Sequence, residues 1–469
     1  MSESDTLSKP SKFFGKDARE KFLVFAGDCE LINEYLHLKS QGSVFVLLRY
    51  INSLLRSFGY VIFANNPISG FIIMVSILSA DPTAGLAAVL CSTLSFLFAL
   101  ILKQDSLGNL NGFFGYNAVL LGTCTAGLLP RLYDSVSVDE PKFWLFLIFT
   151  TFVSVYVTSA LANLFRYLGQ HPIPCFLLPF NFLQYILIFC LLNNSVPPTV
   201  LSEHLLRAPG RADLVPSASP PSERYPPNAE RTGEGLLPSR DELSRSADLA
   251  NGTPSVVSEL PLDEDRIPGN VSADTSANGQ IVWNWGRVFS GTIVSASRVY
   301  GLDHVPASAF ILLALMFYSP ITTLFCYTGS VIATLLGTAF AARPEEVYDG
   351  LWGYNGFLCG GALAGFGFVL TVHSALLTFG AVLFSTVLQH CLTPMFSALD
   401  VPMFAVPFNL TAILFLFVTS DSEKALSRPA NYTFPEKHRY EFNRRFRREF
   451  EGYPRRARVA ETSTSKSDV

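Results

Sequence analysis

The stretch GFFGYNAVLLG, residues 112–122, lies inside an apolar run and returns in similar form as GLWGYNGFLCG at residues 350–360. The spacing from Asn65 in VIFANNP to Asp303 in VYGLDHVP is the same as the spacing between these two stretches. LLPFN at 177–181 also returns, at a slightly shorter spacing, as AVPFN at 405–409. Three landmarks in the same order indicate an internal duplication of the chain.

Composition places the duplicated unit in a membrane. Hydrophobic residues make up 49% of the 469-residue chain and charged residues only 15%, whereas a soluble protein carries about 25% charged residues. Residues 67–102 contain Asp81 as their only charge, and residues 143–165 contain none. About 20 apolar residues in a helix match the hydrocarbon thickness of a bilayer. The sequence therefore predicts an all-α polytopic membrane protein.

Apolar runs divide the chain into six, a break, and six more. The predicted organisation is a cytoplasmic N-terminal segment (1–42), a first membrane repeat (43–194), a disordered extracellular linker (195–280), a second membrane repeat (281–420) and a basic cytoplasmic tail (421–469). An odd number of crossings in each repeat would invert the second relative to the first, the arrangement that builds a pathway at their interface.

The linker and the tail fix the expected sidedness. Residues 195–280 contain no Phe, Trp or Lys, a composition that buries too little apolar area to fold. The tail RYEFNRRFRREFEGYPRRAR is basic and closely follows the last span, which favours a cytoplasmic position for both termini. The linker then lies outside, where the sequons at Asn251 and Asn270 are candidate glycosylation sites.

Enzymatic and metal chemistry have little support in the sequence. The eight cysteines form no close pair, so neither a zinc site nor a disulfide framework is indicated. The histidines are scattered, and the motifs H-E-x-x-H and G-x-S-x-G are absent. We expect no enzyme activity, no cofactor, no metal and no nucleic-acid partner.

The repeated Gly-aromatic-Asn and Pro-Phe-Asn steps favour a solute pathway. One copy alone is explained equally well by close helix packing at Gly and a hydrogen bond from Asn. Pro, however, breaks a helix, and broken backbone is tolerated in a membrane only where it is buried or lines a polar cavity. Two broken segments in matching halves therefore indicate a central pathway.

At these residues the chain resembles the urea transporter family. The motifs are NNPISG (65–70), GFFGYNAVLLG (112–122), LPFN (178–181), ARPEEVYDGLWGYNGFL (342–358) and VPFN (406–409). The resemblance implies two inverted homologous halves with about ten transmembrane helices plus two tilted re-entrant pore helices. It also implies a homotrimer in the plasma membrane with one passive, channel-like urea pore per protomer.

Urea is small, planar and neutral, so a selective slot should present flat apolar faces and oxygen acceptors, and a neutral slot excludes ions by not replacing their hydration. The positions that resemble the family's pore combine narrow-slot residues, the repeated Asn and Pro-Phe-Asn residues, and polar residues near the pore centre. They are Phe63, Tyr116, Asn117, Leu120, Phe180, Asn181, Gln184, Tyr354, Asn355, Leu358, Phe408, Asn409 and Thr411. Packing against core or lipid is the alternative role for the apolar members.

The match departs from the family at the two pore mouths. The family places Gln or Glu there, but this chain has Tyr60 in the first half and, at the equivalent position of the second, Arg298. Gln184 has Ala412 as its counterpart, with Thr411 adjacent. Arg donates hydrogen bonds and cannot accept them. Arg298 either lies near the end of a span and extends to the interface or indicates a pore of altered selectivity.

Three functions follow in order. The leading hypothesis is passive transport of urea through each protomer, with the solute and the lipid bilayer as partners. The first alternative is a divergent pore for another small neutral solute, such as a urea analogue, an amide, ammonia or water. The second is a non-conducting membrane scaffold, suggested by the long linker and the basic tail.

Overall fold

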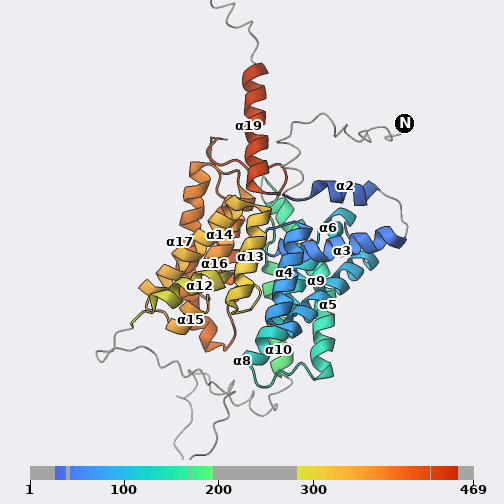
Figure 1. Ribbon diagram of the computed structural model, residues 1–469, viewed down its shortest axis with the longest axis vertical. Helices are drawn as coiled ribbons and strands as arrows, with labels where there is room; N and C mark the ends of the chain where they lie inside the picture. Colours follow the sequence, from blue (N-terminus) through green and yellow to red (C-terminus); the bar gives the residue numbers. More distant parts are fainter. Residues whose placement is uncertain (1–26, 39–42, 169–170, 194–281, 423, 453–469) are drawn as a thin grey trace, which may run out of the picture. The chain divides into compact units, whose positions relative to one another are not determined.

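The computed structural model describes residues 27–38, 43–168, 171–193, 282–422 and 424–452, and these ranges form helices joined by short turns, with no strand among them (Figure 1). The all-α prediction is confirmed for this part of the chain. Almost all of the predicted N-terminal and linker segments, both candidate glycosylation sites and the end of the tail lie outside the described residues.

The helices of the two halves correspond in chain order. The first half contains α3 (Ser43–Tyr60), α4 (Pro67–Ala80), α5 (Pro82–Ile101), α6 (Ser106–Leu110), α7 (Gly115–Thr123), the π-helical turn η2 (Cys124–Leu128), α8 (Leu129–Leu132), α9 (Pro141–Leu168) and α10 (Leu178–Asn193). The second half contains α12 (Trp285–Arg298), α13 (Val305–Tyr318), α14 (Pro320–Ala339), α15 (Pro344–Tyr348), α16 (Tyr354–Gly360), η3 (Gly361–Gly367), α17 (Val372–Ala398) and α18 (Val406–Leu416). Two further helices, α2 (Glu30–Leu38) and α19 (Pro435–Gly452), flank them.

Local sequence explains where several membrane helices begin. Asn66, Asp81 and Ser319 each place a side-chain oxygen over the first turn of the next helix, and a proline follows each of them. Asp81 accepts a hydrogen bond from the Ala84 amide at 2.9 Å. A polar cap satisfies an amide that the helix leaves unpaired, and Pro at the first position has the helical φ already fixed. These pairs therefore set the starts of α4, α5 and α14.

Four helices, α5, α9, α14 and α17, are long and apolar enough to cross a bilayer, and α4, α10, α13 and α18 are shorter but also apolar. Large hydrophobic side chains lie exposed along them, among them Leu97, Leu145, Phe149 and Leu324. A helix satisfies its own backbone hydrogen bonds, so it is a stable spanning element in lipid. The exposed apolar side chains have acyl chains as their natural neighbours, and the chain is a membrane protein.

The duplication is visible in the backbone. Gly112 and Gly350 occupy equivalent turns with φ of +74° and +73°, a region that glycine adopts without strain. Ser57 on α3 and Ser295 on α12 each donate a hydrogen bond to the carbonyl of the glycine in their own half, both at 3.3 Å. The same side chain thus fixes the same turn twice.

The two halves contact each other through α4 and α13, which lie side by side (Figure 1). The Ser69 hydroxyl, in the first turn of α4, donates to the carbonyl of Ala314, near the end of α13, at 2.8 Å. At one end of this contact, Arg131 of α8 pairs with Asp81 at 2.8 Å and with Asp303 at 3.4 Å. An ion pair to each half therefore joins the turn after α4 to the turn before α13.

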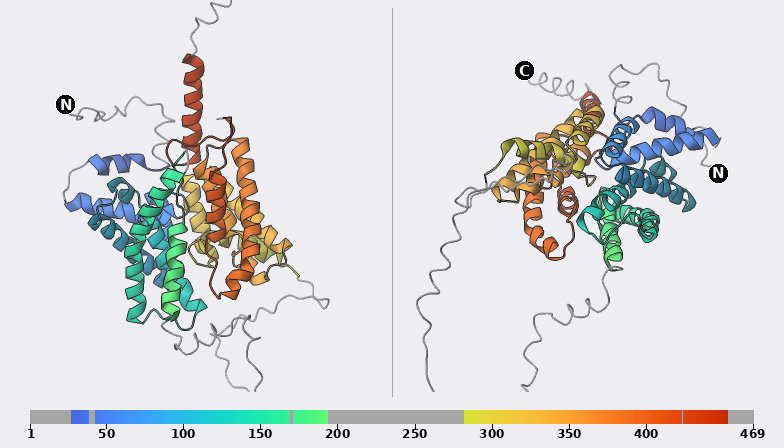
Figure 2. Two further views of the ribbon diagram at one scale, coloured as in Figure 1. Left: turned by 180° about the vertical axis from the view of Figure 1, so that it is seen from behind. Right: turned by 60° about the horizontal axis from the view of Figure 1, so that its bottom comes forward.

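A segment after α18, which we call the C-terminal strap (residues 425–438), packs back onto the helices before α19 extends away from them (Figures 1 and 2). Phe434 is 3% exposed and stacks edge-on against Tyr318 of α13. Lys437 pairs with Asp28 at 3.1 Å and with Glu30 at 2.8 Å. The strap thus connects α13 with the segment that precedes α3.

Gly356→Ala should lower the stability of the second half, because an added Cβ would lie 2.5 Å from the Gly329 carbonyl oxygen and 2.6 Å from the Ala333 Cβ. Overpacking of this kind costs about 1–3 kcal/mol. Thermal unfolding in detergent measures the change. Gly380→Ala is the matched control, since the nearest atom to its Cβ is 3.9 Å away. An equal effect of the two substitutions would contradict this account of the helix contact.

Docking of the strap should weaken as the pH falls from about 6.5 to 4. Burial lowers the pKa of His438 from 6.5 to about 4, and its Nε2 accepts a hydrogen bond from the Thr433 amide at 2.9 Å. The docked imidazole stays neutral where the undocked one takes a proton, which removes up to about 3 kcal/mol across this window. Hydrogen exchange of the strap amides at pH 7.5 and 5 measures it. A similar pH dependence in His438→Gln would overturn the assignment.

Candidate functional site

A cavity of about 380 Å³ lies between the two halves, and we call it the Arg298 cavity. The first half contributes residues of η2, α8 and α10, and the second contributes α12, α16, α17 and the loop before α18. Its lining includes Cys124, Leu128, Leu132, Tyr133, Leu177, Phe180, Arg298, Glu346, Tyr354, Leu358, Gln389, Phe396, Asp400 and Phe404. A largely apolar cleft with a few polar groups is the usual form of a small-molecule site.

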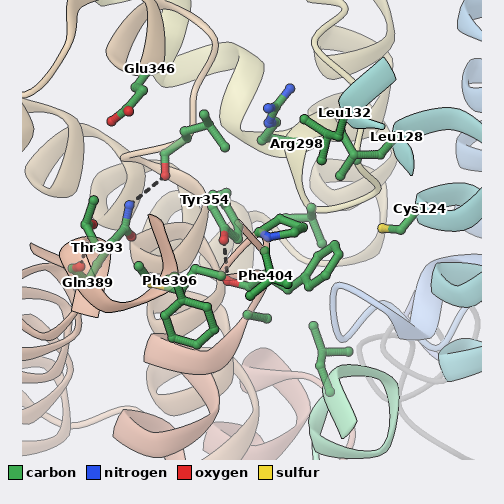
Figure 3. A pocket seen from close by; sticks show the side chains of 18 of the residues that line it. Cys124, Leu128, Leu132, Arg298, Glu346, Tyr354, Gln389, Thr393, Phe396 and Phe404 are labelled. Atoms are coloured by element: carbon green, nitrogen blue, oxygen red, sulfur yellow. Dashed lines mark hydrogen bonds between the residues drawn. The ribbon is translucent and has the colours of Figure 1, made fainter. Parts of the chain in front are cut away.

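Aromatic rings form much of the cavity wall. Phe180 and Phe404 meet edge to face with ring centroids 5.4 Å apart, one from each half. The Tyr354 hydroxyl, which points toward Phe404 in Figure 3, donates a hydrogen bond to the Phe404 carbonyl. Because its hydroxyl is occupied, Tyr354 offers the cavity chiefly the face and edge of its ring.

Arg298 and Glu346 lie on different sides of the cavity, beyond Tyr354 (Figure 3). Glu346 accepts a hydrogen bond from the Trp352 indole at 3.1 Å and lies 3.7 Å from the Arg343 guanidinium. The Arg298 guanidinium makes no hydrogen bond or ion pair with any residue in the described ranges. Five N–H donors of one fixed cation are therefore available to a solute oxygen.

Gln389 holds the polar side of the cavity in place. Its amide donates to the Leu351 carbonyl at 2.8 Å, and its oxygen accepts from Asn355 at 2.9 Å. Asn355 in turn accepts from the Phe408 amide at 3.4 Å. This chain of hydrogen bonds ties α16 to α17 and to the start of α18, so the position of Gln389 is fixed from three sides.

Tyr60, the counterpart of Arg298, lies instead in a packed group of rings that we call the Tyr60 cluster: Tyr60, Phe63, Phe113, Tyr116, Phe176, Phe366 and Phe408. The Tyr60 and Tyr116 ring centroids are 5.1 Å apart, and those of Phe63 and Phe366 are 5.7 Å apart. Phe63 also contacts Phe176 and Phe408. One pseudo-symmetric position thus faces an open cavity, whereas the other is surrounded by aromatic side chains.

The Tyr116 hydroxyl repeats the role of Tyr354 and donates to the Phe176 carbonyl at 2.6 Å. Phe176 and Phe404 have φ of +46° and +48°, an uncommon conformation for residues other than glycine. Each phenylalanine lies just before the Pro-Phe-Asn step that begins α10 or α18. The tyrosines therefore stabilise the turn from which each helix starts.

Most of the predicted amide residues connect helices and do not line the cavity. Asn117 donates to Thr158 at 3.2 Å, and Gln184 pairs with Thr125 at 3.2 Å. Asn409 accepts from the Leu177 amide of the other half at 3.0 Å. Buried amides that are hydrogen-bonded in this way fix the relative positions of helices.

Two predicted polar residues are buried without partners among the described residues. Asn181 is 2% exposed and neither atom of its amide is hydrogen-bonded, and the Thr411 hydroxyl is likewise unpaired. Asn181 directly follows Phe180 of the cavity wall. An unpaired buried polar group is costly and requires an explanation such as a bound water or ligand. Leu358 lines the cavity, whereas Leu120 is fully buried in the core.

Several lining residues were not predicted from the sequence: Tyr133, Glu346, Gln389, Phe396 and Phe404. Gln389 takes the place that Thr158 has in the first half, but it follows its Asn at a shorter interval along the chain than Thr158 does. A search at a constant offset therefore misses it. Phe404 could have been found, because it directly precedes Ala405 of the repeated Pro-Phe-Asn motif.

Comparison with known proteins agrees with this arrangement. The sequence profile of the family described as Urea transporter matches residues 51–216 and 257–420. The chain is 25% identical over 399 residues to urea transporter 1 of Rattus norvegicus, covering 84% of each chain. It is 25% identical over 416 residues to that of Ovis aries, covering 88% of this chain and 87% of the relative. The resemblance seen in the motifs is confirmed, and the chain belongs to the urea transporter family.

Proposed function

We propose that the protein conducts urea passively across the membrane through a conduit in each protomer. The observation that carries this proposal is a cavity between two matched halves, lined by aromatic rings and few charges. Membership of the urea transporter family supports the same solute class, and the relatives it matches are named for urea. The conduit would run from the Arg298 cavity past Phe180 and Phe404 to the Tyr60 cluster.

The residues along this route suit a planar, neutral solute. Flat rings at Tyr354, Phe180 and Phe408 would pack on the urea plane. The unpaired oxygens of Asn181 and Thr411 would accept hydrogen bonds from its NH₂ groups at the narrow part. An ion would lose hydration there without receiving an equivalent set of ligands, so it would be excluded.

We further propose that the halves are inverted, with ten transmembrane helices and two tilted pore helices in a plasma-membrane homotrimer. The contact between the start of α4 and the end of α13 supports inversion. The helices α3 and α12, which run obliquely to the long helices in Figure 1 and end at Tyr60 and Arg298, are the candidates for the pore helices. The basic α19 favours a cytoplasmic position for both termini, and the linker sites Asn251 and Asn270 would then face outward for glycosylation.

A second solute class is favoured by Arg298. A cation at the wall of the cavity presents donors and no acceptors, so it meets a carbonyl oxygen better than an NH₂ group. Amides and substituted ureas, which carry the same carbonyl, would be captured as well as urea itself. The pore would then distinguish solutes less by their NH₂ edges than a mouth with Gln or Glu would.

Proteoliposomes should show saturable urea flux well above that of protein-free vesicles, measured by stopped-flow light scattering. Arg298→Gln should raise the half-saturation concentration for urea several-fold, because a hydrogen bond from a charged donor contributes about 1.5–3 kcal/mol and part of it is lost. The variant should also discriminate more strongly between urea and N-methylated ureas, since Gln supplies an acceptor.

Arg287→Gln on the same helix is the matched control, because the Arg287 guanidinium stacks over the Tyr348 ring, outside the cavity. It should leave urea flux unchanged. Absence of urea flux in an assembled wild type would refute the proposed function. Flux of amides alone would then favour the second solute class, and no flux of any solute would favour a scaffold.

A further inference from the structure

The C-terminal strap lies over the seam between the halves at the Tyr60 cluster. Its first part follows the segment after η3: the Val369 amide donates to the Ser427 carbonyl at 2.9 Å, and the Thr371 hydroxyl donates to the Ala425 carbonyl at 2.6 Å. Arg428 stacks over the Phe368 ring at 4.2 Å from its centroid. These contacts fix the beginning of the strap on the second half.

Tyr432 then carries the strap onto the aromatic cluster. Its ring stacks on Phe366 with centroids 4.9 Å apart and planes 17° apart. Its hydroxyl donates a hydrogen bond to the carbonyl of Pro172, in the loop before α10 of the first half. Phe366 is 4% exposed and contacts both Tyr60 and Phe63. One strap side chain therefore joins the two halves directly over the rings that surround Tyr60.

The end of the strap is held at the turn between α13 and α14. Glu436 accepts hydrogen bonds from the Ser319 hydroxyl at 2.7 Å and from the Ile321 amide at 3.0 Å. Ser319 is the counterpart of Asp81, which Arg131 binds in the first half. The equivalent turn is therefore secured from within the first half in one case and by the strap in the other. This difference breaks the symmetry of the two ends.

We propose that the strap is an autoinhibitory gate, which closes the Tyr60 end of the conduit while Tyr432 is seated on Phe366 and opens it when released. The inference rests on the proposed conduit. At the other end, the conduit has the open Arg298 cavity. Closure at one end is sufficient to stop flux, so the strap needs no counterpart near Arg298.

The contacts that hold the strap are of a reversible kind. The ion pair between Lys437 and Glu30 has a carboxylate side chain 55% exposed, and pairs of this type are weak and screened by salt. The Tyr432 stack and its single hydrogen bond contribute little individually. Each is a local contact outside the long apolar helices, so the strap can leave its site without disturbing the membrane core.

Tyr432→Ala tests the gate. The substitution removes both the stack and the hydrogen bond, so urea efflux should become several-fold faster than in the wild type. Tyr432→Phe keeps the ring and should give an intermediate rate. Tyr50→Ala is the matched control: the Tyr50 ring also meets a phenylalanine, Phe96, at 5.6 Å, and its hydroxyl also forms a hydrogen bond, but on α3 away from the strap. It should not accelerate flux.

A second measurement does not depend on urea. Cys175 is 1% exposed and lies shortly after the Pro172 contact, with its Sγ 3.6 Å from the Tyr116 hydroxyl. Release of the strap should expose it to a small membrane-impermeant methanethiosulfonate, with labelling located by peptide mass spectrometry. Tyr432→Ala should label faster at Cys175, whereas Tyr50→Ala should match the wild type.

The outcomes separate the two proposals. Faster Cys175 labelling in Tyr432→Ala without urea flux in any variant would retain the gate and refute urea as the solute. Wild-type urea flux with neither faster flux nor faster labelling in folded Tyr432→Ala would overturn the gate and leave the conduit intact. If Tyr432→Ala fails to fold, Tyr432→Phe and Glu436→Gln are judged by the same two readouts, and unchanged values in both would also overturn the gate.

Discussion

Two hydrogen bonds from tyrosine hydroxyls to backbone carbonyls determine how the interior of this protein is built. Tyr116 and Tyr354 each bind the carbonyl of a phenylalanine in the left-handed region, at the turn that precedes α10 or α18. In lipid, a carbonyl outside a helix must find a partner within the protein. By supplying it, the tyrosines allow both helices to start inside the fold, so that Phe180 and Phe404 meet as part of one cavity wall.

The same pair of halves produces two different ends. At Arg298 the wall is open and carries a cation without a protein partner in the described ranges. At Tyr60 the equivalent side chain is enclosed by rings, and residues from outside both repeats complete the packing. Duplication supplied the matched helices and turns, while the functional differences come from single positions and from the tail. The chemistry of the site therefore depends on where the symmetry is broken.

The sequence predicted the repeated parts well because they are encoded locally. A polar cap before proline, a glycine in a tight turn and an aromatic-Asn step each depend on a few neighbouring residues, so the offset between copies located them. Long-range contacts could not be predicted in this way. Gln389 and Phe366 have no constant offset or motif to mark them, and the contact between Tyr432 and Phe366 joins residues far apart in the chain. The amides of Asn117 and Gln184 were placed correctly in the interior, but their hydrogen bonds connect helices away from the cavity lining.

The inequality of Arg298 and Tyr60 has a kinetic consequence. A passive conduit between identical solutions must carry equal fluxes in both directions, however different its ends are. The ratio of maximal rate to half-saturation concentration is then the same for entry and exit, although each quantity can differ between them. A cation at one entrance and rings at the other would therefore make the protein saturate at different solute concentrations from the two sides of the membrane, without giving transport a preferred direction.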